Sequence, residues 1–269
     1  MSVRGASAEA VAGLRDQLAG VPSPGTGLGQ DLFGVAGVLR SEPALRRLAT
    51  DVSTDSGAKS GLVRSIFAGK VDQAALDLVA DAVSRRWTAT RDLADALELL
   101  GVIAVVRSAG DQPAQASRLA DELFVIGQTI NENPELRSAL GDPARSVDDK
   151  RALLRGLLEG KVLPESLVLA EQALSGAYRT VGLALADYQK VAASVHEESV
   201  AKVRVAQELS DDERTRLQRA LTRQYGREVH LNVVVDPSLL GGMRVEIGDD
   251  VIDGTVAGKI DEARRKLAG

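Results

Sequence analysis

The sequence of 269 residues has no cysteine, only two histidines and only 3% aromatic residues. Without cysteine it can form no disulfide, no zinc–thiolate site and no cysteine nucleophile. The two histidines, His196 and His230, do not have the spacing of a zinc-protease motif, so a zinc site would have to rest on carboxylates. We therefore expect no metal site.

A long apolar run and a signal peptide are also missing. The longest apolar run, Leu99 to Val106, is far shorter than the ~20 residues that span a bilayer. The N-terminal residues include no apolar segment of the signal-peptide kind. The net charge is −5, and Lys and Arg do not alternate with aromatic residues in the way that nucleic-acid binding favours. We expect no membrane span and no nucleic-acid partner.

Sequence patterns that could suggest a nucleotide, calcium or catalytic site do not have the residue spacing that such sites require. Two Gly-Lys pairs have the wrong spacing for a phosphate loop and are followed by Val71 and Ile260 instead of the Ser or Thr that holds magnesium. The glycines of residues 25–29 do not follow a predicted strand, and the acidic residues of 249–253 do not have the ligand spacing of an EF-hand loop. We expect no catalytic residues, no cofactor and no enzymatic activity of the chain itself.

The sequence matches itself when it is shifted by 91 residues. Residues 31–87 and 122–178 share 16 identities in 57 aligned positions without a gap. Equivalent pairs fall where helices should begin or end, at Pro43 and Pro134, Asp55 and Ser146, and Gly69 and Gly160. Chance similarity between two Ala- and Leu-rich stretches would not favour those positions, so the pattern indicates a duplicated helical unit.

The first 198 residues have the periodicity of helices. Apolar residues between Ala170 and Val195, for example, follow the spacing of one helix face. Residues 21–29 contain several glycines and prolines and are predicted to form a loop. We divide this part into an extra helical repeat at residues 1–90 and a helical bundle domain at residues 91–198.

After residue 198 the pattern changes to that of strands. Apolar residues alternate with polar ones in three segments, at 201–205, 229–235 and 243–247. Ser210 and Glu213 form a capping box that opens a helix, and Thr255 begins a last predicted helix. Residues 199–269 therefore form a small α+β C-terminal domain. The expected fold class is mainly α, with a duplicated helical bundle followed by this domain.

The last part of the sequence carries a specific resemblance. Residues 233–260 closely resemble the C-terminal signature of the delta subunit of F-type ATP synthases, whose mitochondrial counterpart is the oligomycin-sensitivity-conferring protein. Residues 91–100 and 133–137 are similar to the family's helical domain, so the resemblance covers about residues 91–269. Residues 1–90 are a further copy, as in the enlarged delta subunits of actinobacteria. The signature positions, which we expect to set backbone geometry, are Asp236, Pro237, Gly241, Gly242, Gly248, Asp253 and Gly254.

The resemblance implies a mechanical role. The family's helical domain binds N-terminal helices of the alpha subunits of the catalytic head, and its C-terminal domain holds the C-terminal end of the b-type stalk subunits. Together they form the stator, with no catalysis and with a peripheral position at the cytoplasmic face of the plasma membrane. The alternative is a generic helical-repeat adaptor that binds unrelated partner helices.

Binding a partner helix in a groove would use apolar helix faces. The candidate partner contacts are Leu93, Leu97, Leu100, Leu185 and Tyr188. The alternative for these residues is that they form the core of the bundle, because the apolar stripes of helices usually face inward.

Overall fold

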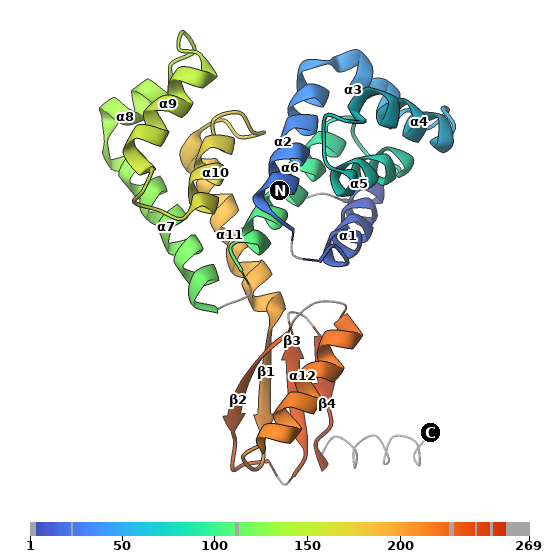
Figure 1. Cartoon of the computed structure of the whole chain (residues 1–269), viewed down its shortest axis with the longest axis vertical. Coiled ribbons are helices and arrows are strands. Elements are labelled where there is room, and N and C mark those ends of the chain that lie inside the picture. The colour runs from blue at the N-terminus through green and yellow to red at the C-terminus, as the bar shows by residue number, and fades with distance from the viewer. Residues whose placement is uncertain are drawn as a thin grey trace. The chain divides into compact units, whose positions relative to one another are not determined.

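The computed structural model describes residues 4–22, 24–110, 113–225, 229–239, 241–247 and 250–256, and the chain divides into two compact units, Met1–Ala193 and Ser194–Gly269 (Figure 1). The helices of the first unit are α1 (Ala6–Ala19), α2 (Thr26–Ser41), α3 (Pro43–Thr50), α4 (Ser56–Phe67), α5 (Gln73–Ser84), α6 (Asp92–Ser108), α7 (Pro113–Glu132), α8 (Pro134–Gly141), α9 (Val147–Leu158), α10 (Pro164–Gln172) and α11 (Val181–Ser199), whose last residues belong to the second unit. Among the described residues, every helix is too short or too polar to cross a membrane.

The helix bounds repeat with the offset of 91 residues. Both bounds of α3 recur in α8 and both bounds of α4 recur in α9, and α3 and α8 each begin with a proline. Asp55 caps α4 by accepting the Ala58 N–H at 3.0 Å, and Ser146 caps α9 by accepting the Asp149 N–H at 3.0 Å. Gly69 and Gly160, which follow the ends of these helices, have φ angles of 72° and 75°. The predicted helix starts and stops of the duplicated unit are confirmed.

Tertiary hydrogen bonds are duplicated as well. Asp31 on α2 accepts the N–H of Asp72, at the start of α5, at 2.7 Å. At the equivalent place in the second copy, Glu122 on α7 accepts the N–H of Leu163, at the start of α10, at 2.7 Å. A carboxylate at this position offsets the partial positive charge of a helix N-terminus. Equivalent hydrogen bonds therefore join α2 to α5 in the first copy and α7 to α10 in the second.

One helix, α6, belongs to both copies. The offset matches residues 97–110 to α1 and matches α6 itself to α11, so α6 is the last helix of the first copy and the first helix of the second. Within one compact unit, α2 lies along α6, which is buried on all sides, as helices inside a larger core are (Figure 1). The predicted boundary between residues 1–90 and 91–198 falls inside this compact unit, so the division of the helical part at that place stays a prediction. The C-terminal unit begins at Ser194, a few residues before the predicted start.

The helix α2 begins earlier than the sequence predicted. It starts at Thr26, inside the predicted loop 21–29. Gly29 is not part of a loop, because it lies in α2 where this helix packs closely against α6. A Cβ atom on Gly29 would lie 2.7 Å from the carbonyl oxygen of Gly101, and one on Gly101 would lie 3.0 Å from the carbonyl oxygen of Gly29. Glycine on both helices thus permits the close crossing.

The helix predicted from the pattern between Ala170 and Val195 is interrupted. The chain leaves helical structure after α10 and re-enters it at α11, with turns at residues 173–180. Gly176 lies in this interruption, and a Cβ atom there would collide with the carboxylate of Glu98 on α6. A continuous helix was the wrong prediction, because apolar spacing does not reveal that a buried carboxylate requires backbone groups at this place.

In the described residues, the second unit consists of a four-stranded sheet and the helix α12. Its elements are β1 (Val200–Val205), α12 (Asp211–Tyr225), β2 (His230–Val235), β3 (Met243–Ile247) and β4 (Asp250–Asp253). The strand order is β2-β1-β3-β4, with β1 parallel to β2 and the other neighbours antiparallel. A parallel pair requires a crossover connection, and α12 supplies it between β1 and β2.

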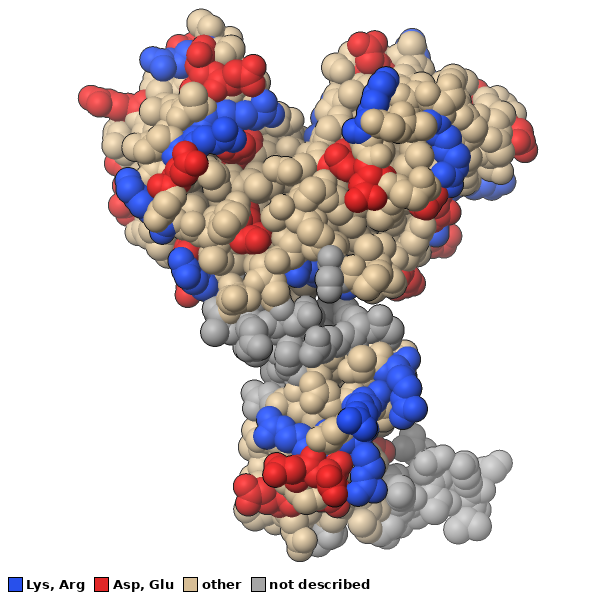
Figure 2. All heavy atoms as spheres, in the orientation of Figure 1, with Lys and Arg blue, Asp and Glu red and all other residues tan. Residues whose placement is uncertain are grey.

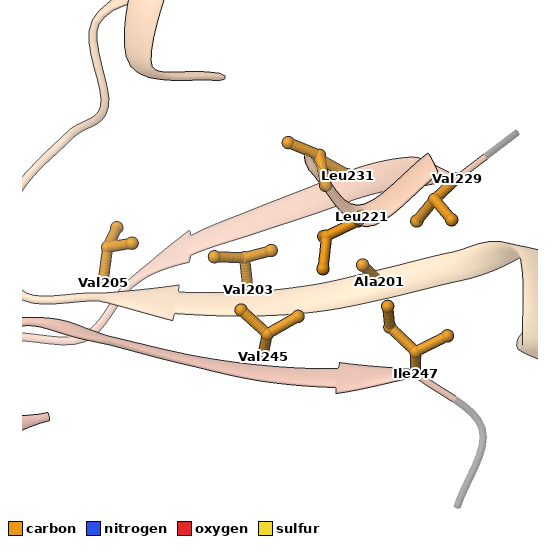
Figure 3. Close-up of a cluster of buried hydrophobic side chains, with 8 residues drawn as sticks. All are labelled: Ala201, Val203, Val205, Leu221, Val229, Leu231, Val245 and Ile247. Carbon is orange, nitrogen blue, oxygen red and sulfur yellow. The ribbon is translucent and has the colours of Figure 1, made fainter. Parts of the chain in front are cut away.

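The core of the second unit lies between the sheet and α12. The predicted capping box opens α12, since Ser210 N–H donates to the Glu213 carboxylate at 2.9 Å and Glu213 N–H donates to the Ser210 hydroxyl at 3.4 Å. Figure 3 shows the buried cluster, which consists of Ala201, Val203, Val205, Leu221, Val229, Leu231, Val245 and Ile247. Gly248 and the predicted last helix beyond Val256 lie outside the described residues. The mainly α fold with a small α+β C-terminal part is confirmed.

Candidate partner-binding surfaces

All five predicted partner contacts lie in the core of the helical unit. Leu93, Leu97 and Leu100 on α6, and Leu185 and Tyr188 on α11, are at most 2% exposed. Side chains buried in this way cannot contact a partner helix in this conformation. This burial supports the alternative that the five residues form the core of the bundle, because the apolar stripes of α6 and α11 face inward, and their contact with a partner stays a prediction.

Tyr188 belongs to a buried polar cluster around Glu98 of α6. Its hydroxyl donates to one carboxylate oxygen of Glu98, and the N–H of Ala177 donates to the other at 3.0 Å. Arg40, from α2 of the first copy, forms an ion pair with Glu98 and a second one with Asp95 at 3.0 Å. Glu98 is fully buried, so these partners compensate a charge that would otherwise be costly. The cluster ties α2 of the first copy to α11 of the second.

The two tyrosines of this region remain neutral hydrogen-bond donors. Burial raises the pKa of the Tyr188 hydroxyl, and the charge of Glu98 raises it further. The ring of Tyr178 lies edge-on to that of Tyr188, with 5.7 Å between the ring centroids. Burial raises the pKa of Tyr178 as well, and the charge of Asp187 adds to this shift. The arrangement is that of a structural cluster, in which both hydroxyls stay protonated.

An apolar groove of about 940 Å³ lies between α7, α8 and α9 of the second copy. Its apolar lining includes Val125, Ile126, Ile130, Leu136, Leu153, Leu154, Leu157 and Leu158. Val125 and Leu157 are large apolar side chains that are nevertheless 57% and 40% exposed. A contiguous apolar surface of this kind marks an interaction site, and a groove between helices is a form that accepts an amphipathic helix.

Charged side chains of both signs surround the groove. At one end, Arg118 pairs with Glu122 at 2.8 Å. Burial alone would raise the pKa of Glu122, but hydrogen bonds from Ser166 and from the Leu163 N–H outweigh it and lower the pKa below its usual value. On the face drawn in Figure 2, Lys and Arg are interspersed with Asp and Glu over the helical unit. Within the described residues, no group of three His, Asp or Glu side chains could hold a metal ion.

In the second unit, the first of the signature residues close a turn after β2. Asp236 accepts the N–H and the hydroxyl of Ser238 at 3.0 and 2.6 Å, which closes the turn that contains Pro237. These hydrogen bonds, from the hydroxyl first and then from the N–H, lower the pKa of the Asp236 carboxyl. The N–H of Asp236 donates to the carbonyl of Val205, so the turn is also bound to the end of β1.

The other described signature residues bring two backbone segments together. Gly242 has a φ angle of 83°, and a Cβ atom there would lie 2.9 Å from the Cα of Thr255. Asp253 accepts the N–H and the hydroxyl of Thr255 at 3.0 and 2.6 Å, and Gly254 N–H donates to a carbonyl of β3 at 2.9 Å. Val256 N–H donates to the carbonyl of Gly241 at 3.1 Å. All of these contacts shape the backbone.

Apolar side chains are exposed on both edge strands of the sheet. On β2 they are Val234 and Val235, and on β4 they are Val251 and Ile252. Edge strands also carry unpaired backbone groups and are therefore common places for contact with another chain. These strands form the second candidate surface, and the groove forms the first.

Comparison with known proteins shows to which family the chain belongs. Residues 103–267 match the family model for the ATP synthase delta (OSCP) subunit. Over all of this chain and 98% of the relative, the sequence is 59% identical to ATP synthase subunit delta of a Nocardioides species. The chain belongs to the delta (OSCP) family. The delta subunits of Thermobifida fusca and Streptomyces coelicolor are 40% and 37% identical over 93% and 99% of this chain, and over 93% and 98% of their own lengths.

Membership of the delta family makes the chain a subunit of the F-type ATP synthase, with the family's role in the peripheral stalk. These relatives match nearly the whole chain, so the first helical copy is part of them too. A chain of the Toxoplasma gondii mitochondrial ATP synthase hexamer matches with a TM-score of 0.32 and 16% identity, over 62% of this chain and 96% of that chain. That likeness is too distant to carry an argument about the fold.

One feature of the sequence could have predicted an exposed apolar surface on α7, and it is independent of the resemblance to the family. The buried residues of α7 follow one stripe, at Leu119, Leu123, Ile126 and Ile130. Phe124 and Val125 are apolar but lie off this stripe, and both are more than half exposed. An apolar residue beside a complete core stripe indicates a second apolar face on the same helix. Of these two residues of the delta subunit, Val125 lines the groove.

Proposed function

We propose that the helical unit of this delta subunit binds an N-terminal helix of an alpha subunit in the groove between α7, α8 and α9. The second unit holds the C-terminal end of the b-type stalk subunits, so the chain links head and stalk and catalyses no reaction itself. In this proposal it lies at the cytoplasmic face of the plasma membrane as a peripheral part of the synthase. The observation that carries the proposal is the apolar groove with its exposed Val125 and Leu157.

The shape and lining of the groove suit a helix. An α-helix with its side chains is about 10–12 Å across, and an amphipathic helix directs one apolar stripe to one side. That stripe can cover Val125 and Leu157, while charged residues on the flanks of the partner helix meet the rim, which carries both signs of charge. Each fully buried apolar side chain contributes about 1.5–3 kcal/mol, so a few such contacts are enough for stable attachment.

The edge strands of the second unit support contact with the stalk. Val234 on β2 and Val251 on β4 are each 53% exposed. Both project from the face of the sheet opposite the buried cluster, because their neighbours in the register, Arg204 and Glu246, do so as well. A stalk segment that covers this face removes both valines from water. This second contact, together with the groove, would hold the subunit at two places.

Calorimetric titration of the purified full-length chain with a peptide of the alpha-subunit N-terminus tests the groove. We expect Val125→Asp to weaken binding in the groove at least about tenfold, because the lost burial corresponds to about 1.5 kcal/mol or more and each 1.4 kcal/mol is a factor of ten. Leu183→Asp is the matched control. Leu183 is 57% exposed, like Val125, but lies on α11 and does not line the groove.

Two results would contradict the proposal. One is a wild-type chain that does not bind the peptide at all. The other is equal weakening by Val125→Asp and by the Leu183→Asp control, since the groove would then have no special part in binding. The alternative of a generic adaptor predicts that a scrambled amphipathic peptide of the same composition binds as tightly as the alpha-subunit sequence.

A further inference from the structure

In the first copy, α4 packs directly against α5. The Ser60 hydroxyl on α4 donates to the carbonyl of Ala80 on α5 at 2.9 Å, and its oxygen lies 2.8 Å from the hydroxyl oxygen of Ser84. The distance between two packed helices depends on the side chains at their contact, and a side chain as short as serine reaches a carbonyl of the neighbouring helix only at close approach. Small residues at this contact therefore allow the two helices to lie close together.

The equivalent helices of the second copy, α9 and α10, have two much larger residues at this contact. After the shift of 91 residues, Arg151 takes the place of Ser60 and Glu171 takes the place of Ala80. The remaining serine is kept as Ser175, but it is exposed. Long side chains between two helices increase the distance between their axes. The sequence of the second copy thus favours a wider spacing of α9 from α10.

Ion pairs hold both large side chains beside this contact. Arg151 pairs with Asp148 of its own helix at 3.0 Å, and Glu171 pairs with Arg155 of α9 at 2.7 Å. Arg151, Arg155 and Glu171 also line a cleft of about 480 Å³, together with residues of α2 such as Gln30. Charged side chains and an open cleft therefore lie where the first copy has direct contact between helices.

Burial differs between the two copies in the same sense. Phe67 of α4 is 6% exposed, whereas its equivalent on α9, Leu158, is half-buried and lines the groove. Lys59 of α4 is 5% exposed, whereas its equivalent, Lys150, is half-buried. The helix α9 is thus covered less completely than α4, and the groove includes a position that the first copy buries.

We propose that Arg151 and Glu171 are spacers, which keep α9 apart from α10 and thereby hold the groove between α7, α8 and α9 open. The first copy, with Ser60 and Ala80 at these positions, shows the closely packed arrangement that the same set of helices adopts without the spacers. This inference concerns the shape of the groove and does not depend on what binds there. Two residues on facing helices then account for one copy being closely packed and the other open.

The accessibility of a single thiol in the groove tests the spacers. The chain has no cysteine, so in the full-length Leu158→Cys chain only this position reacts with a maleimide. Adding Arg151→Ser and Glu171→Ala together should slow the reaction at least about threefold, because a buried thiol reacts only after local opening. Arg151→Met with Glu171→Gln keeps the length of both side chains and should leave the rate unchanged. A separate chain with Leu183→Cys, exposed on α11, should react equally fast with and without the spacer substitutions.

Two results would overturn the inference. One is an unchanged rate at Leu158→Cys when both spacers are shortened. The other is equal slowing by Arg151→Met with Glu171→Gln, since the charges and not the lengths of the side chains would then be the cause. If circular dichroism shows that the doubly shortened chain is unfolded, Arg151→Ser alone should still slow the reaction, and an unchanged rate there counts against the spacers. An alpha-subunit peptide that does not bind contradicts the proposed function alone, because the thiol rates are measured without it.

Discussion

Replacing Arg40 by methionine leaves the buried carboxylate of Glu98 without the cation that faces it. The remaining partners are the Tyr188 hydroxyl and the Ala177 N–H, which do not neutralise the charge. Removing one partner of a buried ion pair costs about 3–5 kcal/mol. The Arg40 side chain is 22% exposed, so water offsets part of that loss, and we expect the free energy of unfolding to fall by about 2–3 kcal/mol.

Urea unfolding at neutral pH measures this loss, and the tryptophan fluorescence reports on the helical unit alone, because Trp87 is the one tryptophan of the sequence. The matched control is Arg64→Met, which removes the ion pair between Arg64 and Asp77 at 2.7 Å. Both side chains of that pair are nearly half exposed, so this substitution should cost less than about 1 kcal/mol.

A double-mutant cycle with Glu98→Gln isolates the charge interaction. Glutamine keeps an oxygen acceptor but carries no charge, so Arg40→Met should cost at least about 1 kcal/mol less in that background than in the wild type. Equal costs for Arg40→Met and the Arg64→Met control, or a coupling energy near zero in the cycle, would refute the reasoning. The buried charge of Glu98 would then be compensated by groups other than Arg40 of the first copy.

Three further predictions concern the packing of glycines in α2, the stability of an N-terminal fragment and the pKa of the Asp253 carboxyl. Gly29→Ala should lower the free energy of unfolding of the helical unit by about 1–3 kcal/mol, because a methyl group has no room against α6. Gly34→Ala on the same helix should raise it by about 0.5–1 kcal/mol, because its Cβ would meet open space. Urea unfolding of both variants measures these changes. A fragment of residues 1–90 should lack cooperative thermal unfolding, and a fragment extended through α6 should regain it, because α6 packs against α1, α2 and α5. The hydrogen bond from the Thr255 hydroxyl, followed by that from its N–H, lowers the pKa of the Asp253 carboxyl, so its contribution to stability is present above the ordinary pKa and is lost as the pH falls through the lowered one. NMR titration should show this pKa rise toward the ordinary value in Thr255→Val, and an unchanged pKa would contradict the assigned cause.

The local structure of this protein could be predicted from its sequence. Asp55 and Ser146 cap the following helices, and Ser210 with Glu213 opens α12. These outcomes depend on hydrogen bonds between residues at most a few positions apart, so the local sequence contains the necessary information. The duplication and the three described segments of alternating apolar residues were also visible, because they are properties of residue order alone.

Which apolar face is buried, and by what, was decided only by tertiary structure. The stripe that includes Leu93 and Leu97 has the same periodicity whether it faces a partner or the core, and only the packing of α2 along α6 showed that it is core. Val125 shows the reverse case, an apolar residue that stays exposed because α8 and α9 leave a groove beside it. Periodicity sets the direction of a side chain relative to its own helix, whereas burial depends on helices that are distant in the sequence and arrive from both copies.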